Sequence, residues 1–143
     1  MPGKYDVDFY AWANEQAALL RAGNLSVADI DNIAEEIATL GRSEQRELVN
    51  RFTVLLMHLL KWQFQCDNRS RSWEVSIKDQ RRQIGWHLRD NPSLKYRLLE
   101  SIAEAYESAV ERAGLETGLP DAAFQVLCSY SPKEVMSADF WPE

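Results

Sequence analysis

Cysteine, histidine and glycine are scarce in this sequence, and long apolar runs are missing. There are two cysteines, two histidines and six scattered glycines in 143 residues. Scattered glycines do not make a phosphate-binding loop, and no Gly-x-Ser-x-Gly motif for a nucleophilic serine is present. The most apolar stretch, residues 54–60, contains His58 and is too short to cross a bilayer. We therefore expect no catalytic residues, no nucleotide-binding loop and no membrane association.

The few potential metal ligands lack a recognisable spacing. Neither histidine has a glutamate three positions before it, as di-iron bundles do, because those positions hold Leu55 and Ile84. The first residues lack the basic and apolar segments of a secretory signal. Without export, Cys66 and Cys128 are expected to be free thiols. We therefore expect a cytoplasmic protein with no metal ion and no organic cofactor.

The net charge of −6 conceals an uneven distribution. Residues 61–97 carry 9 basic and 4 acidic side chains, whereas acidic side chains predominate on both sides of this stretch. Such a basic region is a candidate nucleic-acid footprint. Its candidate phosphate contacts are Arg69, Arg71, Lys78, Arg81, Arg82 and Arg89. A pI near 5.0 and the lack of a helix-turn-helix or other reading motif argue against it, so we expect no appreciable binding at physiological salt.

Helical periodicity dominates the sequence, and no run alternates convincingly with period two. We expect a first helix capped by Asp6 or Asp8 and ended by Gly23-Asn24. The second helix is opened by a Ser26-to-Asp29 capping box and closed by Gly41. The third is capped by Ser43, carries the seam Leu48, Phe52, Leu55, Leu59 and Trp62, and is followed by a loop over residues 66–72. The fourth starts at Ser72 and stops at Asn91-Pro92, and the fifth is capped by Ser93 and fades over residues 114–118. The chain is less regular after Pro120, with one short turn at Ser131-Pro132. The sequence predicts an all-α, single-domain antiparallel bundle (residues 1–143) of about five helices. At least half of its residues are expected to be helical, and its C-terminal segment is expected to be partly irregular.

The second and fourth of these helices raise questions about packing. On the second, Ile30, Ile33, Ile37 and Leu40 share one side, which is expected to face the bundle. On the fourth, Trp86 points away from the apolar side, together with Val75, Arg82 and Arg89. Trp86 is expected to be covered by another helix, to lie under an arginine as a cation–π pair, or to anchor a partner. Val75, Arg82, Trp86 and Arg89 are thus the candidate interaction surface.

Two acidic groups have an ordinary and a functional interpretation. Glu35 and Glu36 lie near Arg42 and Arg46, either as ion pairs of a solvated helix, which we favour, or as a paired-carboxylate site. On the fifth helix, a strip of glutamates points away from the apolar side and is expected to face solvent. The strip consists of Glu100, Glu104, Glu107 and Glu111. Near the end of the sequence, Trp141 is expected to pack against the bundle.

Seven segments together resemble a known family. They are Asp8–Trp12, Glu35–Glu44, Leu59–Trp62, Ser70–Trp73, Gln80–Ile84, Glu116–Pro120 and Asp139–Pro142. In this order they resemble the bacterial "domain of unknown function 29" family, over about residues 5–143. The resemblance implies a compact helical bundle and a bacterial protein, and it implies no activity.

These observations favour a non-enzymatic helical interaction or regulatory protein. Its partner is expected to be an unknown protein or a second copy of the chain, because five tryptophans are present and catalytic motifs are not. The alternatives are a nucleic-acid-binding protein that uses residues 61–97 and an enzyme whose site has no recognisable motif.

Overall fold

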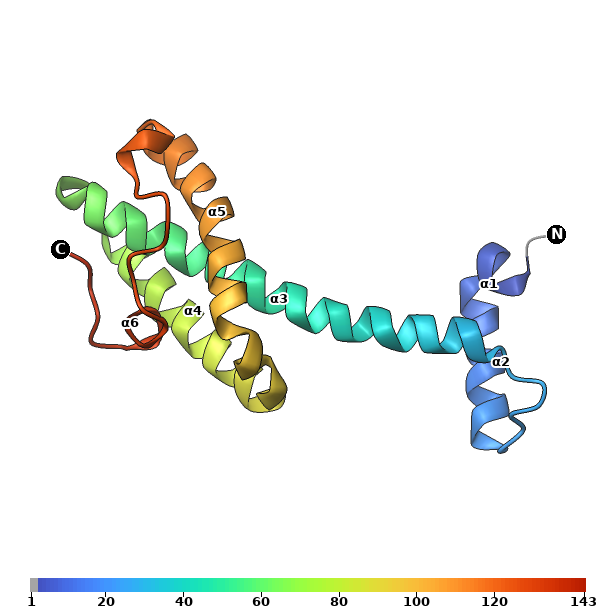
Figure 1. Ribbon diagram of the computed structural model, residues 1–143. Helices are drawn as coiled ribbons and strands as arrows, with labels where there is room; N and C mark the ends of the chain where they lie inside the picture. Colours follow the sequence, from blue (N-terminus) through green and yellow to red (C-terminus); the bar gives the residue numbers. More distant parts are fainter. Residues whose placement is uncertain (1–2) are drawn as a thin grey trace. The chain divides into compact units, whose positions relative to one another are not determined.

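The computed structural model describes residues 3–143, and every regular element in that range is a helix (Figure 1). The α-helices are α1 (Lys4–Val7), α2 (Phe9–Arg21), α3 (Ile30–Phe64), α4 (Arg71–Asp90), α5 (Leu98–Thr117) and α6 (Pro132–Met136). Short 3-10 turns occupy Cys66–Asn68, Pro92–Arg97 and Asp121–Ala123. Helices thus take up well over half of residues 3–143, and no strand occurs there, which confirms the all-α prediction. None of the described helices combines the length and apolar character that a membrane span requires.

The described chain divides into two compact units, one ending at Ser43 and the other beginning at Glu44. The long helix α3 contributes residues to both units. The expectation of a single domain therefore stays a prediction.

The first unit is organised around Trp12. Asp8 caps α2 by accepting a hydrogen bond from the Ala11 amide at 3.1 Å. The Trp12 indole is buried and donates to Asp29 at 2.9 Å. The rings of Tyr5 and Phe9 lie 4.7 and 5.4 Å from the Trp12 ring, between centroids. An aromatic cluster and one indole hydrogen bond therefore hold α1 and α2 to the start of α3.

The second and third predicted helices are one continuous helix, α3, so the expected break at Gly41 is wrong. Glycine ends a helix when it adopts a positive φ. Gly23 and Gly118 do so, with φ of 72° and 77°, and they follow α2 and α5. Gly41 stays helical. Its cost of about 1 kcal/mol relative to alanine is too small to stop a helix that is otherwise well formed.

The start of α3 also differs from the prediction. Ser26 donates to the Asn24 side chain at 3.3 Å instead of forming a capping box, and α3 begins after Asp29, whose carboxylate accepts from Asn32. The apolar side expected to face inward is largely open, since Ile37 is 63% and Leu40 67% exposed. A pattern of apolar positions identifies the apolar face of a helix, but it does not identify what covers that face.

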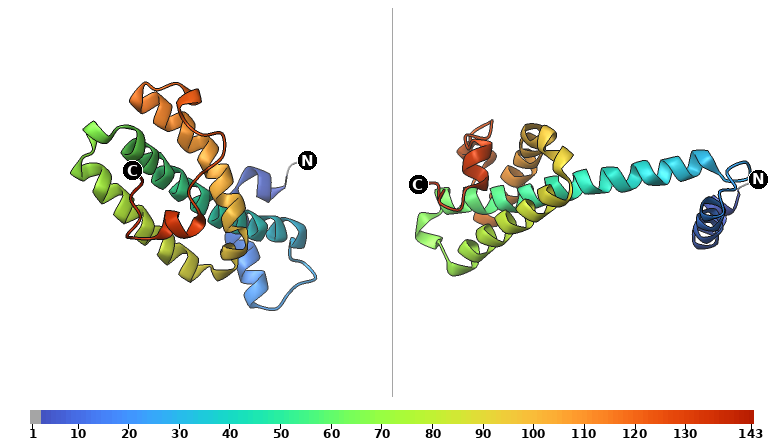
Figure 2. Two further views of the ribbon diagram at one scale, coloured as in Figure 1. Left: turned by 60° about the vertical axis from the view of Figure 1, so that its left-hand side comes forward. Right: turned by 90° about the horizontal axis from the view of Figure 1, so that it is seen from below.

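The second unit is built from the C-terminal half of α3 with α4 and α5. Figures 1 and 2 show α4 running back along α3 and α5 turning back again. The core contains the predicted seam of α3 and apolar residues of both other helices. Fully buried members include Leu48, Phe52, Leu55 and Leu59 of α3, Ile77 and Ile84 of α4, and Ala105 and Ala109 of α5. The up-and-down packing expected from the 4, 3, 4, 3 spacing is found in this unit.

The helix boundaries of this unit follow local capping chemistry. Ser70, two residues before the predicted cap, accepts from the Trp73 amide and starts α4. The predicted stop at Asn91-Pro92 is confirmed. The helix expected from Ser93 begins instead as the 3-10 turn Pro92–Arg97, and α5 follows at Leu98.

The C-terminal segment packs back onto this unit. Ser131 and Glu134 form a capping box that starts α6, and Val135 is fully buried. Farther along, Trp141 is partly buried, and its ring lies 4.7 Å from that of Trp62. The segment therefore docks, as predicted.

Candidate functional site

The four residues of the predicted interaction surface all lie exposed on α4. They are Val75, Arg82, Trp86 and Arg89, here called the α4 strip. At 100° per residue their directions fall within about 60° of one another. Val75 is 56% and Trp86 is 45% exposed. The structure thus brings these residues together on one open side of a helix, while their role stays a prediction.

The structure tests two of the three explanations for Trp86, enclosure by another helix and a cation–π pair with an arginine. A ring that is 45% exposed is not enclosed between two helices. The cation–π pairs of the described residues involve Trp73, Trp62 and Trp141, not Trp86. The two structural explanations are therefore not met, and partner recognition stays a prediction.

Two of the six candidate phosphate contacts are structural. Arg81 is buried, and its guanidinium donates to the carbonyls of Val135 at 2.9 Å and Phe140 at 2.8 Å. Burial lowers the pKa of Arg81. Arg69 donates to the carbonyls of Trp62 at 2.8 Å and Pro142 at 3.3 Å. Both arginines hold the C-terminal segment in place.

Three of the other basic side chains are paired along α4. The ion pairs are Lys78–Glu74 at 2.9 Å, Arg82–Asp79 at 3.8 Å and Arg89–Asp90 at 3.2 Å. The basic groups of residues 61–97 are therefore dispersed and mostly engaged. They do not form one open cationic surface, so the nucleic-acid alternative loses the feature that motivated it.

The acidic groups divide as the favoured interpretations predicted. Glu35 pairs with Arg42 at 2.9 Å, and Glu36 accepts a hydrogen bond from Tyr5, which raises the pKa of Tyr5 to about 12. The glutamates of α5 are all exposed. They are Glu100, Glu104, Glu107 and Glu111, here called the α5 acidic strip.

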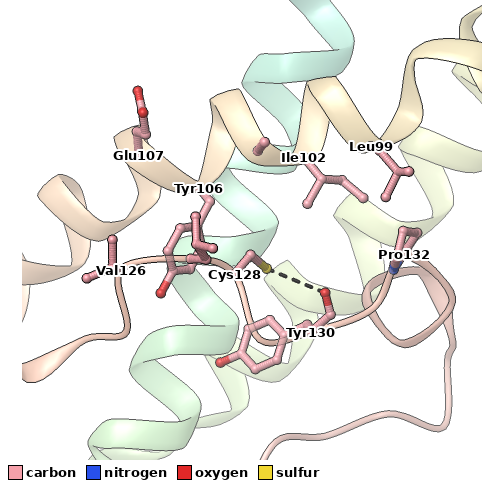
Figure 3. Close-up of a pocket in the computed structure, with 10 residues that line it drawn as sticks. Leu99, Ile102, Tyr106, Glu107, Val126, Cys128, Tyr130 and Pro132 are labelled. Atoms are coloured by element: carbon pink, nitrogen blue, oxygen red, sulfur yellow. Dashed lines mark hydrogen bonds between the residues drawn. The ribbon is translucent and has the colours of Figure 1, made fainter.

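An apolar cavity of about 270 Å³ lies between α5 and the segment that follows it (Figure 3). Leu99, Tyr106 and Val126 contribute to its wall, and Glu107 of the acidic strip lies at its edge. The Cys128 thiol donates to the Tyr130 carbonyl at 3.6 Å, and burial raises the thiol's pKa. Because the thiolate is the nucleophilic form, a raised pKa makes Cys128 a poor nucleophile. The cavity is therefore suited to an apolar group rather than to covalent catalysis.

A second cavity, of about 460 Å³, is polar and lies beside the α4 strip. Trp86 and Arg89 line it together with Gln83, Asn91 and the carboxylate of Asp90. Its lining contains no serine, threonine or cysteine, so it offers no side-chain nucleophile of these types.

The lining of this polar cavity contains an arrangement that the sequence did not reveal. Glu44 and Glu47 of α3 and His87 of α4 place one potential ligand atom each within 4.8 Å of one another. His87 is buried, with Nδ1 3.3 Å from a Glu47 oxygen and Nε2 2.8 Å from the Glu44 carbonyl. By contrast, His58 is half-buried and donates from Nδ1 to the Val54 carbonyl at 2.8 Å, and burial lowers its pKa.

Spacing along one helix does not reveal this cluster, because the acidic neighbours of His87 come from another helix. The di-iron spacing concerns only glutamates three positions earlier on the same helix. The helical wheel carried a weak signal, since His87 lies about 40° from Trp73 at the border of the inward side of α4. A polar residue at that border points toward the neighbouring helix, but the wheel does not tell which residues it meets.

Comparison with known proteins identifies the family of this chain but no activity. No curated protein and no solved structure matches it. A family model described as "Domain of unknown function DUF29" matches residues 4–141, nearly the whole chain. With this coverage, and with the helical fold described above, the chain belongs to the DUF29 family.

Proposed function

We propose that this protein is a non-enzymatic helical interaction protein that associates with a second copy of itself through the α4 strip. The observation that carries the proposal is the Trp86 ring, 45% exposed on a regular helix with Arg82 and Arg89 beside it. Tryptophan and arginine are the residues most enriched among those that dominate binding energy at interfaces. A bacterial origin and a cytoplasmic location are part of the same proposal.

The chain itself carries a complementary surface. The apolar cavity next to α5 offers a place for an aromatic ring, and Glu107 at its edge belongs to the α5 acidic strip. In the proposed contact, Trp86 of one copy enters this cavity in the other copy. Arg82 and Arg89 then meet the glutamates of the strip. An apolar anchor with charged pairs at its rim is the usual anatomy of a specific interface.

The arginines are available for such an exchange of partners. Their present ion pairs lie within α4, and the Arg82 and Arg89 side chains are 57% and 69% exposed. Exposed pairs of this kind contribute about 0–1 kcal/mol. Burying the open part of the Trp86 ring contributes about 2–3 kcal/mol per contact. With two equivalent contacts in a two-fold dimer and the cost of association, we expect a dissociation constant in about the micromolar range.

The alternative functions have less support. The basic side chains of residues 61–97 are dispersed, so the charge pattern no longer favours a nucleic-acid site. That the protein does not bind nucleic acid stays a prediction. Neither of the two cavities described above favours an enzyme. The apolar one contains a thiol whose pKa is raised by burial, and the polar one is lined by no serine, threonine or cysteine.

Sedimentation equilibrium of charge-swapped chains tests the proposal. One chain carries Arg82→Glu with Arg89→Glu, and the other carries Glu104→Arg with Glu107→Arg. Each swapped chain alone brings like charges together and is expected to be monomeric. An equimolar mixture restores both contacts and is expected to form a mixed dimer, which weakens with rising salt because the charged groups are exposed.

Trp86→Ala tests the apolar anchor, and Tyr96→Ala is its matched control. Tyr96 is an aromatic residue that is 93% exposed outside the α4 strip. We expect Trp86→Ala to weaken the dimer at least tenfold and Tyr96→Ala to leave it unchanged. A wild-type chain that stays monomeric at high concentration would contradict the proposal, and so would swapped chains that fail to pair when mixed.

A further inference from the structure

We propose that Glu44, Glu47 and His87 form a binding site for one divalent first-row transition metal ion of the Zn²⁺ type. The site lies within the second unit, in the polar cavity that Trp86 and Arg89 of the α4 strip also line, and it does not require the proposed self-association. Its three residues come from two helices that are fixed in the core. Leu48 of α3 is completely buried, and Leu88 of α4 is 7% exposed. The ligand set is thus attached to rigid elements.

The hydrogen bond of His87 determines which ring nitrogen is free. The Glu44 carbonyl, 2.8 Å from Nε2, can only accept, so Nε2 carries the proton and donates it. In the neutral ring Nδ1 is then an unprotonated acceptor. It faces a Glu47 carboxylate oxygen, which is also an acceptor, at 3.3 Å. Two acceptors at this distance repel each other unless a proton or a cation lies between them.

The distance between these two atoms suits a metal ion. Nitrogen and oxygen ligands bind Zn²⁺ at about 2.0–2.2 Å in tetrahedral geometry, which separates two ligand atoms by about 3.4 Å. The observed separation of Nδ1 and the Glu47 oxygen is 3.3 Å. One oxygen of the Glu44 carboxylate lies 3.5 Å from Nε2, the protonated nitrogen, and the side chain is 48% exposed. Glu44 therefore has to turn its carboxylate from Nε2 toward the Nδ1 side to supply a third ligand within this cluster.

The neighbours of these ligands orient them as they do in metal proteins. A ligating histidine almost always donates its other N–H to a carbonyl or carboxylate, which is the role of the Glu44 carbonyl in this site. Arg51 donates to one oxygen of Glu47 at 3.0 Å and leaves the other toward His87. Imidazole with two carboxylates is a ligand set for Zn²⁺ and neighbouring transition ions rather than for Ca²⁺.

The surrounding charge and space allow a cation. Among the charged side chains that line the polar cavity, three are carboxylates and two are arginines. One arginine, Arg89, is already paired with Asp90. The cavity of about 460 Å³ leaves room for a water molecule or another small ligand at a fourth position.

Zinc binding to the full chain tests this inference, with equilibrium dialysis as the first measurement. We expect one Zn²⁺ per chain and at least a tenfold loss of affinity in Glu47→Gln and in Glu44→Gln. Both glutamates are partly exposed, so these variants are expected to fold. The matched controls are Glu74→Gln, His58→Gln and Cys66→Ser. They remove a carboxylate, an imidazole and an exposed thiol elsewhere and are expected to bind zinc as the wild type does.

Nitrogen-15 NMR of the histidine rings provides a second readout, which does not require a variant of the buried His87. We expect zinc to shift the Nδ1 resonance of His87 while Nε2 keeps its proton and His58 is unaffected. The inference is overturned if the chain takes up no zinc. It is also overturned if uptake survives in the Glu44→Gln, Glu47→Gln double variant or disappears in Cys66→Ser.

Discussion

Arg81 carries a positive charge into the core of the second unit. Its side chain is 7% exposed, and its hydrogen-bond acceptors among the described residues are main-chain carbonyls rather than carboxylates. Carbonyl dipoles thus compensate a buried cation, and the guanidinium also lies 5.7 Å from the Trp141 ring. The geometry needs arginine, because three donor contacts reach separate carbonyls of the C-terminal segment.

We predict that Arg81→Met lowers the free energy of unfolding by about 2–4 kcal/mol. Methionine keeps an unbranched apolar side chain but leaves buried carbonyls without donors, and each lost bond to a charged group costs about 1.5–3 kcal/mol before the guanidinium's own desolvation is subtracted. Urea unfolding followed by circular dichroism measures the change. Lys78→Met is the control on the same helix, because its exposed pair with Glu74 contributes only tenths of a kcal/mol. Equal stabilities of the two variants would contradict this role.

Residue types alone did not separate structural arginines from surface ones. Arg81 and Arg82 are neighbours in the sequence, and both were candidates for phosphate contacts. Helical geometry distinguishes them, because Arg81 lies about 20° from Leu88 at the edge of the inward side, whereas Arg82 points outward. What the wheel does not supply is the acceptor, since the carbonyls of Val135 and Phe140 arrive from more than fifty positions away.

Among the elements, α3 shows how far a glycine acts as a helix stop. Gly23 ends α2 with a positive φ, whereas Gly41 lies inside α3 without one. The predicted stops that were confirmed combine several signals, as at Asn91-Pro92, where the proline removes a donor and restricts the residue before it. Where only one weak stop signal is present, the neighbouring residues determine whether the helix continues. Gly41 is flanked by residues that continue the helix.

We predict that Gly41→Ala stabilises the helix by about 0.5–1 kcal/mol, because alanine loses less backbone entropy on folding. No atom beyond the local helix backbone lies within 4 Å of the added methyl group. Amide hydrogen exchange of residues 38–45 is expected to slow by about twofold to fivefold, which corresponds to that free energy.

Gly23→Ala is the opposite control for this substitution. Its methyl group also meets no neighbour, but φ is +72°, a conformation that costs an L-residue about 1–2 kcal/mol. Exchange near Gly23 is therefore expected to speed up. If both alanine substitutions slow exchange, the sign of φ does not determine how alanine changes local stability. The different φ values of Gly23 and Gly41 would then not explain why a helix ends at one glycine and continues through the other.

At the scale of the whole molecule, the fold class was predictable and the contacts between distant segments were not. The seam from Leu48 to Leu59 fixed the core of the second unit, because apolar spacing determines which side of a helix is buried. The same kind of spacing at Ile37 and Leu40 led to the wrong expectation of burial. The cluster of Glu44, Glu47 and His87 and the carbonyl partners of Arg81 depend on tertiary neighbours, which one sequence does not encode in any local pattern.

The C-terminal segment joins several of these distant contacts. Trp141 packs on Trp62, and Phe140 lies 5.5 Å from Tyr130, between ring centroids. The carbonyls of Phe140 and Pro142 accept hydrogen bonds from the two structural arginines. Residues 139–143 therefore supply both apolar area and hydrogen-bond acceptors to the second unit.

We predict that removing residues 139–143 lowers the melting temperature by several degrees. The loss of two packed rings outweighs the ordering entropy of the segment, about 1–2 kcal/mol per residue, because Pro142 and the rigid aromatics have little freedom to lose. A change of 1 kcal/mol shifts the melting temperature by about 4–8 °C in a unit of this size. Removing Glu143 alone is the control and is expected to change nothing, since Glu143 is exposed. The longer deletion could instead leave the melting temperature unchanged and weaken the dimer. That result would make residues 139–143 part of the interface, because only a recognition element affects association without contributing to the stability of its own chain.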